Sequence, residues 1–351
     1  MTNLSKYLLD EIKLHPLLAP QDVVKLCYQA AFGAEHLLSN PTQALGYFFE
    51  EYEDTLVDDK PLTEYISPTV CRVNLSAWKR LKLNPDWLWR LFLSASNHSL
   101  MSDETSLEDF ITQADYLCKT GSFPFSYDQW VEYINDYKRN VPSPPVRHSA
   151  MYRENAKPAY RILSGLAAKV LPIFELMSGM DKGVIAIDGR AASGKTTLTR
   201  YLCDIIPAGN IAMDDFFLPP ELRTIERLSK PGGNIHHERF TQDVLPHIRS
   251  DKGFLYRKFD CNKMEYNNNL TEVIPSPWRI VEGVYSFHPE LGKYMDVRVS
   301  LDINPTEQSS RIKARNNAKV ANEYLTKWVP MEEAYFNEYN IYEAADIVIR
   351  I

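Results

Sequence analysis

The residues best suited by type and spacing to do chemistry lie in the segment Gly189-Arg-Ala-Ala-Ser-Gly-Lys-Thr196. The segment fits the pattern G-x-x-x-x-G-K-[ST], follows an apolar run at 184–187 and precedes a helix-like run at 197–206. Glycines let the backbone turn tightly enough to aim successive N–H groups at one point, and the following helix adds its positive N-terminal end. The pattern therefore predicts a loop that binds phosphate groups.

We expect this loop to hold a nucleoside triphosphate. Lys195 would reach the outer phosphates, and the Thr196 hydroxyl would help to hold the Mg²⁺ that bridges them. ATP and Mg²⁺ are therefore the expected cofactors. The alternative is a glycine-rich turn that binds nothing, and the order of strand, loop and helix argues against it. The expected nucleotide-binding residues are Gly189, Ala191, Ala192, Ser193, Gly194, Lys195, Thr196 and Thr197.

Three acids follow predicted strands in the same half of the chain. Glu282 comes directly after Ile280-Val281, where proteins with such a loop place an acid that holds Mg²⁺ directly or through water. Asp214 and Asp215 follow a short predicted strand at 209–213. We expect Asp214 to accept the proton of a substrate hydroxyl and Asp215 to cap the next turn.

An alternation of strands and helices from residue 181 onward would bring these groups together. Helix-like runs at about 197–206, 238–249, 305–317 and 331–342 separate β-like runs at 184–187, 209–213, 254–259, 279–283, 297–301 and 346–351. Such alternation implies parallel strands joined by right-handed crossovers, with the site at the carboxyl ends of the strands. We predict an α/β domain at 181–351 with a doubly wound parallel sheet.

The preceding half has a different pattern, and we predict a separate, mostly α-helical domain at 1–178. Apolar residues recur at helical spacing at about 4–12, 21–38, 42–53, 84–96, 106–119 and 126–137, with one strand-like piece at 68–75. No activity can be assigned to this domain. Its most suggestive segment gathers Arg147, His148, Arg153, Lys157, Tyr160 and Arg161, which fits an anionic ligand site or a solvated surface that faces an acidic domain.

Composition narrows the classes of function. The 351 residues carry a formal net charge of −7, which argues against a nucleic-acid binder because phosphate-backbone affinity needs clustered Lys and Arg. The five cysteines are scattered and never in C-x-x-C spacing, so we expect reduced thiols and a cytoplasmic protein. Neither a signal peptide nor a membrane span is expected. The oligomeric state stays open, and a homo-oligomer is one option.

Four further segments resemble the uridine kinase and phosphoribulokinase group of P-loop small-molecule kinases, over roughly 181–351. Met213-Asp-Asp-Phe-Phe217 is similar to the family's Asp-x-Phe-Tyr segment, whose first Asp is the catalytic base. The other three resemble its substrate-side hairpin, metal-site strand and arginine-rich lid helix, and are Tyr256-Arg-Lys-Phe-Asp260, Val281-Glu-Gly-Val-Tyr285 and Arg311-Ile-Lys-Ala-Arg315. The resemblance implies that Asp214, Lys195, Arg311 and Arg315 are catalytic, and that Thr196, Glu282 and Asp214 hold the metal.

The resemblance also implies a substrate side, formed by Asp215, Phe217, His236, His237, Tyr256, Arg257 and Tyr285. Two departures fall on that side. Where relatives often carry Asn-x-Asp-His, this chain has Asn234-Ile-His-His237, and the family's tyrosine is replaced by Phe217. A carboxylate and a hydroxyl are therefore missing, which leaves the acceptor open. Adjacent histidines point apart, so we expect His236 and His237 to contact substrate or solvent rather than a metal.

The expected function is ATP-dependent transfer of a phosphoryl group to a hydroxyl of a small metabolite, a nucleoside or a sugar-like molecule. Within the same fold, the alternatives are acceptors such as ribosylnicotinamide, pantothenate, glycerate or a sugar phosphate. A different class is a nucleotide-gated switch that acts through the helical domain. Acceptor-stimulated release of ADP would discriminate between a kinase and a switch.

Overall fold

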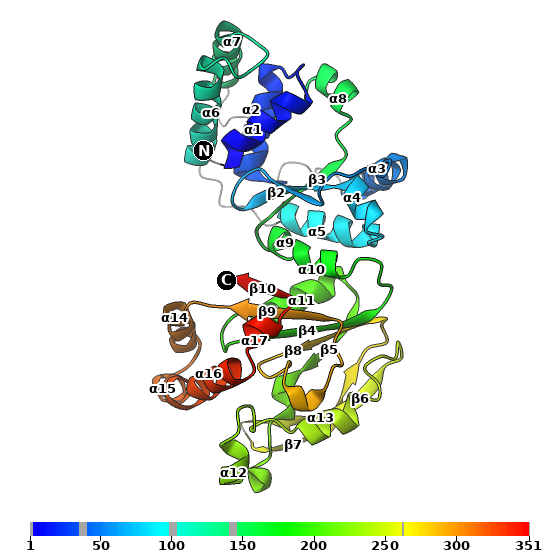
Figure 1. The fold of residues 1–351 in the computed structure, drawn as a ribbon, viewed down its shortest axis with the longest axis vertical. Coiled ribbons are helices and arrows are strands. Elements are labelled where there is room, and N and C mark those ends of the chain that lie inside the picture. The colour runs from blue at the N-terminus through cyan, green and yellow to red at the C-terminus, as the bar shows by residue number, and fades with distance from the viewer. Residues whose placement is uncertain (1–2, 35–40, 98–103, 140–145, 262, 351) are drawn as a thin grey trace. The chain divides into compact units, whose positions relative to one another are not determined.

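The structure is a computed structural model, which describes residues 3–34, 41–97, 104–139, 146–261 and 263–350 (Figure 1). The chain divides into two compact units, Met1–Gly179 and Met180–Ile351. Among the described residues, no helix has both the length and the apolar character that a membrane crossing requires.

The second unit is built on a five-stranded sheet in the order β10-β9-β4-β8-β5 (Figure 1). Every neighbouring pair is parallel, which confirms the predicted α/β fold. After β4 the chain next enters the sheet at β5, which lies on the β8 side of β4, whereas β9 later joins β4 on the opposite side. The strand order therefore reverses at β4, and ligands bind in such sheets at the loop that follows this strand. The strands are β4 (Gly183–Gly189), β5 (Ala208–Ala212), β8 (Trp278–Glu282), β9 (Val297–Asp302) and β10 (Ile347–Arg350).

Burial explains why these sequences form the inner strands of a parallel sheet. Every residue of β4 and β8 is buried, as expected for strands covered on both faces, where apolar runs replace alternation. Val184, Ala186, Ile211 and Val281 pack in one hydrophobic cluster with Phe240 of α13. An antiparallel hairpin, β6 (Phe254–Asp260) and β7 (Glu265–Val273), stands outside the parallel sheet.

Helices and short turns link these strands. The long connections hold α11 (Lys195–Ile205), α12 (Ile225–Leu228), α13 (His237–Asp243), α14 (Pro305–Arg315), α15 (Ala318–Glu323), α16 (Val329–Glu338) and α17 (Ile341–Ala344). Three 3₁₀ turns, η2 (Met213–Phe216), η3 (Pro220–Leu222) and η4 (Pro289–Leu291), and a π-helical turn, η5 (Tyr324–Trp328), complete the set.

Three predicted helices are shorter than the sequence suggested. In the first unit, the helix expected at about 21–38 ends at Phe32, and positions 35–38 of that expectation lie outside the described residues. The helix expected at about 238–249 ends at Asp243, three residues before Pro246, which has no N–H to continue the helical hydrogen bonds. The helix expected at about 331–342 is split, because Asn340 takes a left-handed conformation with φ 47° and α17 begins directly after it.

The first unit is mostly helical, as predicted, but it also contains a small sheet. Its helices are α1 (Asn3–Leu14), α2 (Pro20–Phe32), α3 (Pro41–Asp54), α4 (Leu75–Arg80), α5 (Pro85–Asn97), α6 (Glu104–Lys119), α7 (Tyr127–Tyr137), α8 (Ala150–Ala156), α9 (Gly165–Lys169) and α10 (Leu171–Leu176). The antiparallel sheet β1-β2-β3 consists of β1 (Thr63–Tyr65), β2 (Val70–Asn74) and β3 (Tyr160–Ser164). The expectation of an almost strand-free domain therefore missed β1 and β3.

Candidate active site

The predicted phosphate-binding loop connects β4 to α11 and has the backbone that an anion site needs. Gly189 has φ 148° and Gly194 has φ 93°, conformations that favour glycine. A Cβ at Gly189 would also lie 2.8 Å from the Leu301 carbonyl oxygen. Gly194 is the N-cap of α11 and supplies no side-chain acceptor for the first N–H groups of that helix. These N–H groups fit an anionic ligand, because the start of a helix is positively polarised.

Two side chains of the loop support this fit. The Lys195 ammonium donates to the carbonyl oxygens of Gly189 at 2.7 Å and Arg190 at 3.0 Å. Because an ammonium group has three N–H donors, one is left for a phosphate oxygen. The Ser193 hydroxyl is buried and has no hydrogen-bond partner among the described residues. The loop therefore offers donors for an anion from both backbone and side chains.

The strand ends beside the loop carry the predicted metal residues. The Thr196 hydroxyl donates to Glu282 Oε1 at 3.1 Å, which joins the start of α11 to the end of β8. Burial raises the pKa of Glu282, and the Asp214 carboxylate raises it further. The part of the chain that the structure describes holds no cluster of three or more His, Cys, Asp or Glu side chains that would bind a metal alone. Mg²⁺ commonly uses one or two carboxylates together with phosphate oxygens, and Thr196 with Glu282 fits that mode.

Asp214 and Asp215 lie in η2, directly after β5, and have different surroundings. The Asp215 side chain is buried, accepts a hydrogen bond from the Tyr256 hydroxyl at 2.6 Å and pairs with Lys258 at 3.3 Å. Asp214 is exposed to solvent but closely surrounded by protein, which raises its pKa, while the Lys195 cation acts in the opposite direction and Asp215 adds to the increase. Asp214 is therefore the carboxylate of this pair that is accessible to a substrate.

The two predicted lid arginines both lie on α14, with different contacts. Arg311 donates to Glu307 at 2.7 Å and to the carbonyl oxygen of Ala192 in the loop at 3.4 Å. Arg315 is exposed, lies over the Tyr324 ring at 5.4 Å and is close enough to Asp214 to lower the pKa of that carboxyl. The structure thus brings α14 to the loop and to η2.

The remaining predicted substrate residues fall into three pairs with different surroundings. Tyr256 and Tyr285 are buried, and burial strongly raises the pKa of both hydroxyls, so they act as neutral hydrogen-bonding groups. His236 contacts the Tyr266 hydroxyl at 3.1 Å, whereas His237 is buried and stacks on His288 at 4.1 Å. The other predicted residues, Phe217, which lies 6.3 Å from the Trp328 ring, and Arg257, whose side chain is exposed, have no described polar contact to the loop.

Sequence patterns did not indicate several residues that hold the loop in place. Asp188 is fully buried and accepts hydrogen bonds from the Gly189 and Phe287 N–H groups at 2.7 and 3.1 Å and from the Tyr335 hydroxyl at 2.7 Å. The Ala191 N–H donates to Glu332 at 2.8 Å. Except for the Gly189 contact, each of these hydrogen bonds joins residues that are 99, 141 or 147 positions apart in the chain. Only the fold therefore shows that these residues meet.

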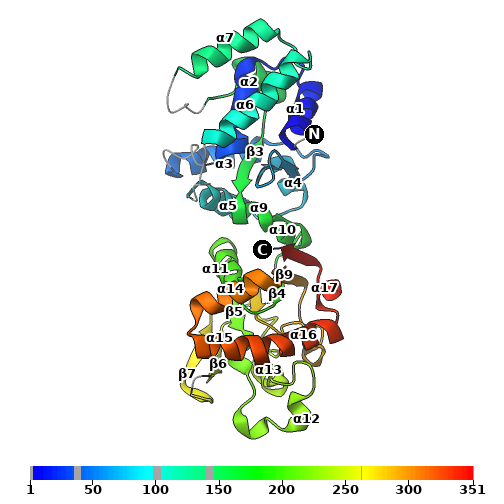
Figure 2. The same ribbon diagram turned by 90° about the vertical axis from the view of Figure 1, so that its left-hand side faces the viewer.

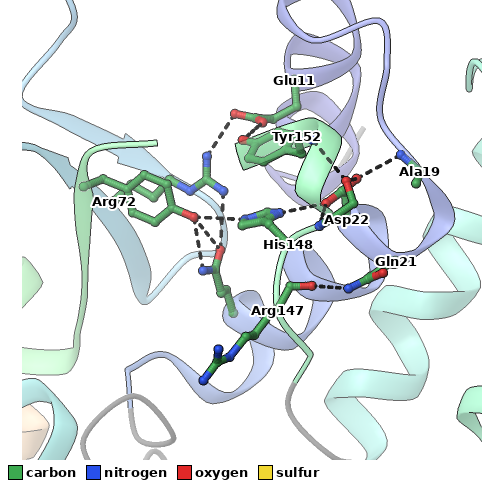
Figure 3. Close-up of polar contacts among 11 residues, drawn as sticks. Glu11, Ala19, Gln21, Asp22, Arg72, Arg147, His148 and Tyr152 are labelled. Atoms are coloured by element: carbon green, nitrogen blue, oxygen red, sulfur yellow. Dashed lines mark hydrogen bonds and ion pairs between the residues drawn. The ribbon is translucent and has the colours of Figure 1, made fainter. Parts of the chain in front are cut away.

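The first unit contains a second polar cluster (Figure 3). Arg72 is buried and donates to Glu11 at 2.9 Å, and Glu11 also accepts from the Tyr152 hydroxyl at 2.8 Å. His148 Nδ1 lies 3.1 Å from Asp22 Oδ1. Each of these side chains has at least one protein partner, as buried charged groups require in a stable core, although Arg72 Nε has none among the described residues.

The residues of the basic segment in this unit have different surroundings. His148 and Tyr160 turn into the polar cluster, where their side chains lie 3.2 Å apart. Arg161 instead pairs with Glu51 at 2.8 Å, and its guanidinium lies 4.8 Å from the Phe48 ring centre. The other three basic side chains, Arg147, Arg153 and Lys157, are exposed. The six residues therefore divide between the core and the surface.

No family model matches the chain, and no curated protein matches it. Solved structures with a similar fold cover about half of the chain. One is described as a possible uridine kinase from Bacillus stearothermophilus, with 18% identity, a TM-score of 0.41, and coverage of 52% of this chain and 98% of that one. Another is a D-glycerate 3-kinase from Cryptococcus neoformans, with 15% identity, a TM-score of 0.35, and coverage of 53% and 88%. The chemistry of the site therefore rests on the chain's own residues.

Proposed function

We propose that the second unit is an ATP-dependent kinase that transfers the γ-phosphoryl group to a hydroxyl of a small metabolite. The observation that carries the proposal is the meeting of three elements at the carboxyl ends of β4, β5 and β8. These are the phosphate-binding loop, the Thr196–Glu282 contact and the accessible carboxylate of Asp214. A nucleotide loop needs only the first of them, whereas phosphoryl transfer to a hydroxyl needs all three.

Each side chain has a role that follows from its position. Lys195 has one N–H donor left for a phosphate oxygen, and the α11 N–H groups bind neighbouring oxygens. Thr196 and Glu282 would hold Mg²⁺. ATP supplies the phosphoryl group that is transferred, and Mg²⁺ would offset the negative charge of that group. Asp214 takes the proton from the attacking hydroxyl, and its raised pKa makes it a better base than an ordinary exposed aspartate. Asp215 cannot take that role, because Tyr256 and Lys258 occupy its carboxylate.

We further propose that the acceptor is a nucleoside or a sugar-like molecule. Two neutral tyrosine hydroxyls support this choice, because such groups commonly bind hydroxyl-rich ligands. Burial raises the pKa of Tyr285, which lies close enough to Asp214 for that carboxylate to raise the pKa further, and Tyr256 donates to the neighbouring Asp215. Lys258, Arg257 and His236 would suit an acceptor that also carries an acidic group, which keeps glycerate, pantothenate and sugar phosphates as alternatives. A nucleotide-gated switch is the second class of function.

A panel of purified acceptors tests the proposal. Full-length protein is incubated with MgATP and one nucleoside, vitamin, sugar or hydroxy acid at a time, and ADP formation is measured. We expect at least one acceptor to raise ADP formation well above the rate with ATP alone, and Asp214→Asn to remove that increase. ATP hydrolysis that no acceptor stimulates would contradict a kinase and favour a switch.

A further inference from the structure

The first half of the phosphate-binding loop is held by the segment 305–342, which we call the lid segment. Ala191 is fixed through both backbone groups, because its N–H donates to Glu332 at 2.8 Å and its carbonyl oxygen accepts from Gln308 at 3.2 Å. The neighbouring Arg190 donates to Glu333 at 2.9 Å, and its guanidinium lies 4.8 Å from the Phe336 ring centre. Residues 190 and 191 are therefore bound to α14 and α16 rather than to the sheet alone.

Apolar packing joins the same two parts. Ala191 forms a small buried cluster with Ile312 of α14 and Ala321 of α15, and the partly buried residues packed against it are Ala192, Tyr324, Leu325 and Val329. Because Ala191 has only a methyl group, this cluster is small and cannot alone fix the lid segment strongly. The polar contacts of Arg190, Ala191 and Ala192 therefore contribute most to joining the lid segment and the loop, and Glu332 supplies the one to the Ala191 N–H.

A local irregularity of the helix precedes Glu332. The chain from α15 through η5 to α16 continues as one helical run, and its middle turn, Tyr324–Trp328, is π-helical (Figure 2). A π-helical turn adds a residue to the turn and rotates the following face, and such turns are frequent at functional sites. Glu332, four residues after this turn, is buried and contacts the loop at the Ala191 N–H, whereas Glu338 at the end of α16 is exposed.

Glu332 lies among charged groups from several elements. Its side chain is buried, and the groups that act on it are Lys195 of α11, Asp188 of β4 and Asp214 of η2, while Tyr285 and Tyr324 lie near it. Burial raises the pKa of Glu332 to about 7, Lys195 and the Ala191 N–H oppose the increase, and the two aspartates add to it. A buried carboxylate beside other carboxylates is costly, so its retention at the loop calls for a role.

We propose that Glu332 is a positioning residue that couples the lid segment to the phosphate-binding loop, a role that rests on the proposed kinase function. Its carboxylate holds the Ala191 N–H and thereby the first half of the loop, while the N–H groups of residues 194–196 stay directed at the phosphate position. Nucleotide binding and lid position are then linked, because whatever orders the loop also orders α16. The protonation state of Glu332 modifies that linkage, since a charged carboxylate beside the loop repels an incoming phosphate.

The test uses the full-length protein and measures ATP affinity by calorimetry and trypsin cleavage within the lid segment. We expect Glu332→Ala to weaken ATP binding by about tenfold and to speed cleavage at α14 and α15, because the loop and the lid segment separate. Glu332→Gln keeps an oxygen that accepts from the Ala191 N–H, so its affinity at pH 6 should stay within about threefold of wild type. Glu338→Ala, on the same helix, is the matched control and should leave both measurements unchanged.

A pH series separates positioning from a merely structural role. Glu332→Gln cannot ionise, so the ratio of its ATP affinity to that of the wild type should rise between pH 6 and pH 8, whereas a structural role would leave the ratio constant. This measurement remains decisive even where Glu332→Ala fails to fold. If the wild type binds ATP but the ratio is constant and Glu332→Gln and Glu332→Ala behave alike, the coupling is wrong while the kinase proposal stands. If the wild type binds no ATP, both proposals fail.

Discussion

The Thr196 hydroxyl, at the start of α11, donates a hydrogen bond to the Glu282 carboxylate, at the end of β8, across 3.1 Å. This contact places an oxygen from the phosphate-binding loop and an oxygen from a separate strand where one cation can reach both. Removing the charge of the Glu282 carboxylate should therefore weaken Mg²⁺ binding more than nucleotide binding. We expect Glu282→Gln to raise the Mg²⁺ concentration for half-maximal ADP formation by about tenfold. An unchanged Mg²⁺ requirement would contradict this role of Glu282.

The second prediction concerns Lys195. Among the described residues, its ammonium donates to two loop carbonyl oxygens and leaves one donor for a ligand, so we expect the fold to tolerate its removal. Lys195→Ala should lower turnover by about a hundredfold or more, because a cation that stabilises charge on the transferring phosphoryl group is lost. Circular dichroism and thermal melting check the fold. Near-normal turnover in a folded Lys195→Ala protein would overturn the phosphate-binding assignment.

The two adjacent aspartates should behave differently. Asp214→Asn removes the accessible base and should lower kcat strongly, with little change in ATP affinity, because the nucleotide is held by the loop. Asp215→Asn keeps an acceptor for the Tyr256 hydroxyl and should lower kcat much less. Steady-state kinetics at saturating ATP compares the two variants. If Asp215→Asn is the more damaged, Asp214 is not the base.

The arginines of α14 should act mainly on the rate of transfer. Arg311 already contacts the loop at the Ala192 carbonyl, and Arg315 lies near Asp214. Arginine near the transferring group stabilises charge that spreads over its oxygens, so Arg311→Ala and Arg315→Ala should each lower kcat by about tenfold or more. Lys319→Ala, at an exposed position of α15, is a control that should not change kcat. Unchanged rates for both arginine variants would show that α14 is not part of the catalytic site.

The Asp22–His148 pair should make the stability of the first unit depend on pH. Burial lowers the pKa of His148 below its usual value of 6.5, and the Asp22 hydrogen bond opposes this only partly. The unfolded chain therefore binds that proton more readily, so the stability contributed by neutral His148 is present above about pH 6.5 and is lost as the pH falls.

Hydrogen exchange at α2 and α8 measures this effect in the full-length protein. After correction for intrinsic exchange rates, protection in the wild type should fall between pH 7 and pH 5. In His148→Gln, protection should start lower and change less over the same range, because the titrating imidazole is gone. Equal pH dependence in the two proteins would show that His148 is not the responsible group.

Local spacing made much of the second unit predictable. The octapeptide from Gly189 to Thr196 encodes strand end, turn and helix start within eight positions, and the buried strands β4 and β8 are continuous apolar runs. Asp214 and Glu282 could be placed at strand ends for the same reason. The acids are close in space only because β5 and β8 are neighbours, with Ala212 opposite Glu282.

The remaining features depend on contacts that no local pattern carries. Glu332 contacts Ala191, which is 141 positions away in the chain. The sequence around Glu332 indicates only a surface helix with two acids. Tyr160 and Arg161 belong to β3, which forms because Arg161 pairs with Val73 of β2, not because the segment has a clear strand pattern. Pairings of this kind become visible only when the fold fixes which distant residues meet.

The fate of the γ-phosphoryl group is the most direct test of the central claim. Protein, Mg²⁺, an active acceptor and ATP labelled at the γ-phosphate are mixed, and the label is followed by chromatography in the wild type and in Asp214→Asn. We predict that the wild type places the label on the acceptor in equal amount to the ADP formed, and that Asp214→Asn places almost none. Label released as inorganic phosphate at the same rate with and without acceptor would contradict the account.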